Sequence, residues 1–177
     1  MKIDPARLVF IDEAGAKTNM TRLRGRAPRG ERVIEYAPAG HWHTTTMLAA
    51  LRIDRVEAPL VIDGPMDSVV FRGYVEQMLA RTLHEGDVVV MDNLSPHKTQ
   101  GVQAAIEEAG ATVRYLPPYS PDFNPIEPMW SKVKPGLRSA AARDAPELLT
   151  AIGNALRSVT PGDCAGFFAG YGYSATQ

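Results

Sequence analysis

Along its first third, the chain alternates short apolar blocks with polar, turn-forming segments and shows no helical period. The apolar blocks are rich in β-branched and aromatic residues, as is typical of strands. The predicted strands are Leu8–Ile11, Val33–Tyr36, Thr44–Leu51 and Leu60–Ile62, the first of them ending at Asp12. We expect these segments to form a meander of antiparallel strands.

The middle of the chain alternates between the periods of helices and strands. An apolar stripe with a period of about 3.6 residues begins after a capping residue at Asp67 or Ser68 and stops at Gly86. The predicted order is helix 67–86, strand 88–91, helix 95–110 and strand 112–116. The strand 88–91 is uninterrupted by polar residues, which is typical of a strand covered on both faces.

Two further helices are predicted in the last third of the chain. The first begins after Asn124-Pro125 and should break or kink at Pro135, whereas the second spans 144–159. The tail beyond Pro161 has aromatic residues and glycines without a period, so we expect irregular structure there. Antiparallel strands followed by alternating helices and strands predict a mixed α/β sheet with helices on its faces.

Composition limits the class of protein without identifying a function. The 177 residues are 45% hydrophobic, which suffices for one globular domain. The 19 basic and 20 acidic residues nearly cancel, so net charge gives no indication of a nucleic-acid partner. A single cysteine, Cys164, excludes an internal disulfide, and no Cys/His cluster has the spacing of zinc ligands. Without a signal peptide or a membrane-spanning run, we expect a soluble, cytoplasmic protein with no membrane partner.

Three carboxylates are candidates for metal chemistry. Asp12 and Asp92 follow the two most strand-like runs, and neighbouring parallel strands would place them at one edge of the sheet. A divalent cation such as Mg²⁺ or Mn²⁺ would offset their repulsion, although each can also be an ordinary aspartate at a strand end. Glu127 has the spacing of a capping box with Asn124, or it can present its carboxylate on a polar helix face. Trp130 should pack that helix on the sheet.

Several segments match one family. They are Phe10-Ile11-Asp12-Glu13, Gly25-Arg26-Ala27-Pro28-Arg29-Gly30, Met91-Asp92-Asn93 with His97, and Leu116-Pro117-Pro118-Tyr119-Ser120-Pro121-Asp122-Phe123-Asn124-Pro125-Ile126-Glu127-Pro128-Met129-Trp130. The chain closely resembles the DDE transposases of bacterial insertion sequences related to mariner elements. The 34 residues between Asp92 and Glu127 match the spacing for which this family is named.

The resemblance implies a fold and a mechanism. The fold would be ribonuclease-H-like, with a mixed five-stranded sheet whose first three strands are antiparallel, parallel strands after them, and helices on both faces. Asp12, Asp92 and Glu127 would be the catalytic residues and would hold two Mg²⁺ or Mn²⁺ ions for phosphoryl transfer. The partners would be transposon ends and target DNA, the active form a homodimer, and the location the nucleoid of a bacterial cytoplasm.

Other residues are candidates for contact with DNA. Six basic residues stand against one acidic residue between positions 17 and 32, which predicts an exposed basic loop. Arg22, Arg24, Arg26 and Arg29 in this loop can contact phosphates, as can Lys134 and Arg138 on the helix of Glu127. The alternative for the loop is a solvated segment without a partner. Asn93 and His97 can orient a phosphate or a metal-bound water, or they can simply cap the following helix.

The resemblance also has limits. Family members carry an N-terminal helix-turn-helix region that recognises the ends of the element, and we expect none within these 177 residues. We therefore expect a single catalytic domain over residues 1–177, with end recognition in a separately encoded N-terminal half. Three rival functions remain: another ribonuclease-H-like nuclease, a phosphatase using Asp12 as nucleophile, and an inactive remnant that binds DNA or a full-length transposase. The phosphatase would need an Asp-x-Asp-Gly sequence, and Ala14 and Gly15 follow Glu13 instead.

Overall fold

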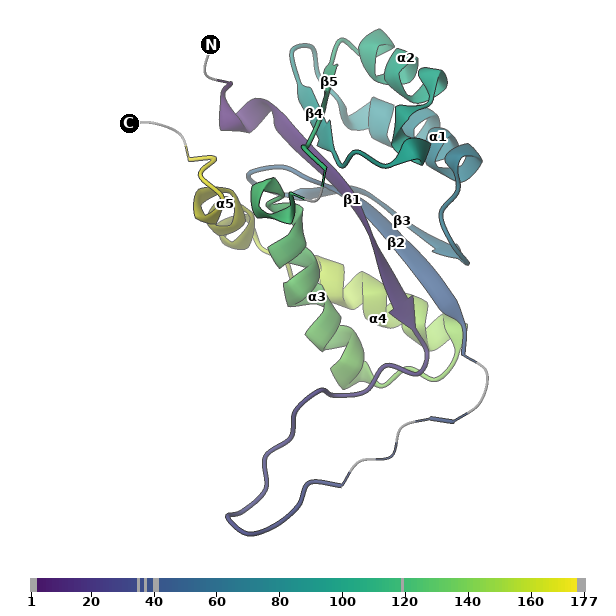
Figure 1. Ribbon diagram of the computed structural model, residues 1–177, viewed down its shortest axis with the longest axis vertical. Coiled ribbons are helices and arrows are strands. Elements are labelled where there is room, and N and C mark those ends of the chain that lie inside the picture. The colour runs from purple at the N-terminus through teal and green to yellow at the C-terminus, as the bar shows by residue number, and fades with distance from the viewer. Residues whose placement is uncertain (1–2, 35, 37, 40–41, 119, 175–177) are drawn as a thin grey trace.

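The computed structural model describes residues 3–34, 36, 38–39, 42–118 and 120–174, and these are built around one mixed sheet (Figure 1). Its strands are β1 (Leu8–Lys17), β2 (Thr44–Leu51), β3 (Val56–Asp63), β4 (Val88–Met91) and β5 (Thr112–Tyr115). They lie in the order β3-β2-β1-β4-β5. The pairs β1–β2 and β2–β3 are antiparallel, whereas β1–β4 and β4–β5 are parallel. The predicted mixed five-stranded sheet is confirmed.

Helices cover both faces of the sheet (Figure 1). One face carries α1 (Ser68–Gln77) and α2 (Gln100–Glu108), and the other carries α3 (Ile126–Ala140), α4 (Ala145–Arg157) and α5 (Pro161–Gly170). Short 3₁₀ turns are η1 (Pro5–Arg7), η2 (Leu79–Thr82), η3 (Ser95–Lys98) and η4 (Pro121–Phe123). Among the described residues, no helix is both long and apolar enough to cross a bilayer.

Alternate residues of β1 supply two separate cores. Val9 and Ile11 pack with α1 and α2, whereas Leu8 and Phe10 pack with α3, α4 and α5. Successive side chains of a strand point to opposite faces, so β1 has to be apolar without interruption where both faces are covered. The uninterrupted apolar run in β4 has the same cause.

Several sequence predictions differ from the structure. Of the predicted strand Val33–Tyr36, residues 33, 34 and 36 have no regular structure and are exposed, and residue 35 lies outside the described part. The helix α3 does not break at Pro135 but continues to Ala140, because buried residues on either side of the proline hold it on the sheet; a kink there stays a prediction. The tail forms α5, which a capping box of Thr160 and Asp163 begins and the buried Phe168 anchors.

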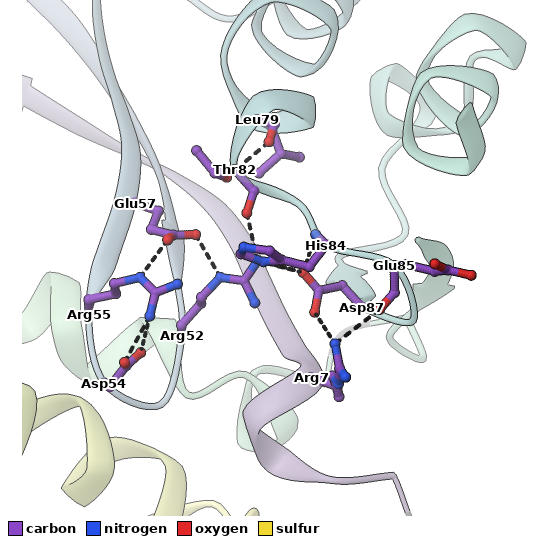
Figure 2. Close-up of polar contacts among 10 residues, drawn as sticks. All are labelled: Arg7, Arg52, Asp54, Arg55, Glu57, Leu79, Thr82, His84, Glu85 and Asp87. Carbon is purple, nitrogen blue, oxygen red and sulfur yellow. Dashed lines mark hydrogen bonds and ion pairs between the residues drawn. The ribbon is translucent and has the colours of Figure 1, made fainter. Parts of the chain in front are cut away.

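A buried ion-pair network ties the β2–β3 hairpin to the start of β4 (Figure 2). Arg52, directly after β2, donates to Asp87 at 2.6 Å and to Glu57 at 2.6 Å. It also donates to the Thr82 carbonyl oxygen at 2.9 Å. Burial alone would raise the pKa of Asp87, but hydrogen bonds from Arg52 and the His84 N–H outweigh this and lower it. The network lies at the end of β4 opposite to Asp92.

Replacing Arg52 by leucine should lower the free energy of unfolding by about 3–5 kcal/mol, because the Asp87 carboxylate would remain buried without its partner. Denaturant unfolding followed by circular dichroism measures this loss. The control is Arg55→Leu, which removes an arginine with a side chain 45% exposed and should cost less than about 1 kcal/mol. Equal losses in the two variants would show that the buried pair has no special role.

Candidate active site

The parallel pairing of β1 and β4 brings Asp12 and Asp92 together. Leu8 lies opposite Val88 and Phe10 opposite Val90, so two residues further the same register places Asp12 level with Asp92. Side chains alternate between the two faces of a strand, and Asp12 and Asp92 follow two residues after Phe10 and Val90, which face α3. The side chains of both aspartates therefore point to the α3 side of the sheet. Asp12 does not end its strand as expected, since β1 continues to Lys17 while β4 stops at Met91.

Glu127 reaches the same place from the first turn of α3. Ile126 and Trp130 are buried against the sheet, so the neighbouring Glu127 lies on the exposed side of the helix. The predicted packing of Trp130 is thereby confirmed. The capping-box alternative is contradicted, because α3 begins after Pro125 and none of the described side chains caps it.

The three carboxylates line one cavity of about 350 Å³. It lies between the ends of β4 and β5 and the start of α3, beside a proline-rich wall. The rest of its described lining is polar at Asn93, Ser120 and Asn124 and apolar at Leu94, Leu116, Pro117, Pro118 and Pro121. Leu116 N–H donates to the Met91 carbonyl oxygen at 2.9 Å, which fixes this wall beside Asp92.

His97 contacts Asp92 from outside the cavity lining. Its Nδ1 lies 2.5 Å from Asp92 Oδ1 as an ion pair rather than an aligned hydrogen bond, and its Nε2 lies 3.2 Å from Glu13 Oε2. The ring is buried against Phe71, with 4.2 Å between centroids. The Leu94 N–H also donates to Asp92 Oδ1, at 3.1 Å. His97 therefore orients Asp92 instead of capping the next helix.

The charges of these groups depend strongly on one another. Burial and the nearby Glu127 raise the pKa of Asp12 to about 7. Burial would also raise the pKa of Asp92, but the contact with His97 lowers it overall. Although burial opposes the charged ring, Asp92 and Glu13 raise the pKa of His97 to about 9. The cavity thus concentrates negative charge, and a cation bound there would relieve it.

The cavity is not a preassembled metal site. In the described part of the chain, no three His, Cys, Asp or Glu side chains are already close enough to hold an ion together. The three carboxylates face a shared space, however, and are hard oxygen donors of the kind that Mg²⁺ and Mn²⁺ prefer.

The predicted basic residues lie apart from the cavity. Lys134 and Arg138 are half-buried further along α3, outside the described lining. Arg22, Arg24, Arg26 and Arg29 are exposed on the segment 18–34, which projects beyond the end of β1 (Figure 1). Arg143 holds the base of this segment, donating to the carbonyl oxygens of Thr18 at 3.1 Å and Met20 at 3.2 Å.

Two site residues escaped the sequence analysis. Glu13 contacts His97, which is 84 residues away, and no local pattern connects them. Asn124 lines the cavity, although its position before a helix predicted only a cap. The one sequence feature that could have identified Asn124 as a site residue is its place in the family-matching segment that leads to Glu127.

A family model covers most of the chain. Residues 7–149 match the family described as DDE superfamily endonuclease. No curated protein matches the chain.

Solved structures of the Mos1 transposase have a similar fold. The Mos1 strand transfer complex is 15% identical, with a TM-score of 0.69 over 93% of this chain and 51% of that one. The mariner Mos1 paired end complex with Mn is 14% identical, with a TM-score of 0.67 over 93% and 52%. The catalytic domain of the Mos1 mariner transposase is 13% identical, with a TM-score of 0.56 over 97% and 85%. The chain spans about half the length of the first two. The expected ribonuclease-H-like fold is confirmed.

Without divalent cations, the Asp12 carboxyl should titrate near pH 7, because burial and Glu127 both oppose its ionisation. Glu127→Gln should lower the pKa of Asp12 but leave it above the ordinary 3.8, since burial is the larger cause. Carboxyl-carbon NMR shifts followed through a pH titration measure this. Glu108→Gln, on the opposite face, should change nothing; an unaltered pKa in Glu127→Gln would mean that the two side chains do not interact.

Proposed function

Because the chain belongs to the DDE superfamily endonucleases, we propose that it is the catalytic domain of a DNA transposase that cleaves and rejoins DNA at transposon ends. The observation that carries this proposal is the convergence of Asp12, Asp92 and Glu127 on one cavity from β1, the end of β4 and α3. These three would be the catalytic residues.

The same carboxylates would hold two divalent ions, Mg²⁺ or Mn²⁺. The raised pKa of Asp12 supports this assignment, since it reflects crowded negative charge that a cation would offset. Bound ions would make a water or a DNA 3′-hydroxyl a better nucleophile and would stabilise the leaving oxygen. One of the similar Mos1 complexes is described as containing Mn.

The chain's own contribution would be to hold its groups in place. His97 and the Leu94 N–H fix the orientation of Asp92, so this ligand would lose little freedom when an ion binds. The proline-rich wall is short of hydrogen-bonding groups and would limit the entry of water beside the reacting phosphate. Asn93 lines the cavity and would be an accessory contact.

DNA would be bound outside the cavity as well. Arg22, Arg24, Arg26 and Arg29 would contact phosphates from the segment 18–34, and Lys134 and Arg138 from α3. We further propose that residues 1–177 act as one catalytic domain within a homodimer, because joining two ends requires two sites. Similar Mos1 structures are described as strand transfer and paired end complexes.

Asp92→Asn should abolish Mg²⁺-dependent nicking of supercoiled DNA while leaving the fold intact, because the amide is a weaker metal ligand. Gel assays of plasmid nicking, with circular dichroism of the variant, measure both. Asp122→Asn changes an exposed carboxylate outside the described cavity lining and should nick like wild type. Full nicking by pure Asp92→Asn would refute the assignment, and wild-type binding to DNA without cleavage would favour an inactive regulator.

Reversing the charges of Arg24 and Arg26 with glutamate should weaken DNA binding and flatten its salt dependence. Each lost phosphate contact reduces the slope of log affinity against log salt by about 0.9. Fluorescence anisotropy at several salt concentrations measures the slope. The control reverses the exposed Arg81 and Arg157, which changes net charge equally. The same slope in both double variants would favour a solvated loop without a partner.

A further inference from the structure

Two successive carboxylates of β1 leave the sheet on opposite faces. Asp12 lines the cavity. Glu13 instead shares the strand face of Val9 and Ile11, which pack with α1 and α2. It lies outside the described lining of the cavity, and its side chain is 25% exposed. The Glu13 carboxylate is therefore not one of those that would hold cations directly.

The described partner of the Glu13 carboxylate is His97. Nε2 of the ring lies 3.2 Å from Glu13 Oε2, and among the described residues this carboxylate makes no other hydrogen bond or ion pair. Nδ1 of the same ring lies 2.5 Å from Asp92 Oδ1. A single imidazole thus connects a carboxylate outside the cavity lining to one within it.

Other contacts hold the backbone and the ring face of His97. Its N–H donates to the Leu94 carbonyl oxygen at 3.2 Å, and its own carbonyl oxygen accepts from the Tyr115 hydroxyl at 3.2 Å. One face of the ring packs on Phe71, and the His97 side chain is 2% exposed. These contacts fix where the ring lies, but none of them involves a ring nitrogen.

The freedom that remains is rotation of the ring about its Cβ–Cγ bond. This torsion is broad and roughly two-fold, so orientations related by a half-turn have similar intrinsic energies. A half-turn would exchange Nδ1 for a carbon beside Asp92, and that carboxylate would lose its ion-pair partner. The packing on Phe71 would survive, because it involves the ring face. Glu13 distinguishes the two orientations, since only one of them directs Nε2 toward its carboxylate.

We propose that Glu13 is a positioning residue that holds the His97 ring in the orientation in which Nδ1 contacts Asp92. This inference rests on the proposed function, in which Asp92 would be a metal ligand. Loss of a group that orients a metal ligand typically lowers metal affinity or activity by roughly 10- to 100-fold. Glu13 acts one step further away, through His97, so we expect a loss near the lower end of this range.

The first test observes the ring itself and needs neither DNA nor a metal ion. Nuclear Overhauser contacts from the His97 ring protons to neighbouring side chains show whether the ring keeps one orientation or exchanges between two. Wild type should keep one orientation, and Glu13→Ala should populate both. Glu13→Gln should keep one, because its amide oxygen can still accept a hydrogen bond from Nε2.

The second test measures metal binding and activity. Mn²⁺ affinity is followed by the electron paramagnetic resonance of the free ion, and nicking of supercoiled plasmid is followed across Mg²⁺ concentrations. Glu13→Ala should lower Mn²⁺ affinity, and raise the Mg²⁺ concentration for half-maximal nicking, by roughly 10-fold. Glu13→Gln should retain most of the affinity. Glu108→Ala, which changes an exposed carboxylate on α2, should match wild type.

A second background separates positioning through His97 from the loss of a negative charge next to Asp12. In His97→Asn, the amide nitrogen can replace Nδ1 beside Asp92, but the shorter side chain does not extend to Glu13. Adding Glu13→Ala in this background should change Mn²⁺ affinity by less than about twofold, as for residues that no longer interact. A pure charge effect would persist there in full.

The outcomes distinguish this inference from the proposed function. A single ring orientation in Glu13→Ala, or an undiminished effect of Glu13→Ala in the His97→Asn background, would overturn the role of Glu13 alone. Equal losses in Glu13→Gln and Glu13→Ala would do the same, since charge and not position would then decide the affinity. If the wild-type protein neither binds Mn²⁺ nor nicks DNA, the proposed function fails, and the role of Glu13 fails with it.

Discussion

The parallel register between β1 and β4 is the constraint on which the other features of the site depend. It places two aspartates side by side on one face of the sheet, and it does so with only three paired positions. Covering both faces of these strands requires uninterrupted apolar residues up to the point where the aspartates begin. The two cores and the packing of α3 on the sheet both bury this pair of strands.

The same register brings negative charges close together, and the two aspartates respond to this repulsion in different ways. Asp92 is offset by His97, so its negative charge is maintained. Asp12 has no such partner among the described residues and responds by holding its proton more tightly. The two carboxylates therefore differ without a bound ion: Asp92 is held ionised, whereas the ionisation of Asp12 would be favoured by a bound cation. This difference is a common property of sites built for function rather than for stability.

Much of the fold and part of the site could be predicted from local patterns. The strands β2, β4 and β5 are short runs rich in β-branched residues, and the helix α4 has a clear period and an N-cap at Asp144. Asp12, Asp92 and Glu127 stand in segments that match one family. Several failures share a physical cause, which is that long-range contacts decided the outcome, whereas α5 begins at a local capping box that the aperiodic tail obscured. Pro135 was tolerated because buried residues hold α3 on both sides of it. Glu13 and His97 meet only through the sheet, and Asn124 resembles a cap until its side chain is seen to line a cavity.

The four-residue length of β4 also limits how this protein can change during evolution. Asp87 at one end is locked to Arg52, and Asp92 at the other end faces the cavity, so both ends of the strand are committed. Inserting or deleting a single residue between them would turn one aspartate to the opposite face of the sheet. Arg143 anchors the start of the segment 18–34 beside the end of β1. Relatives of this chain should keep the interval from Asp87 to Asp92 constant.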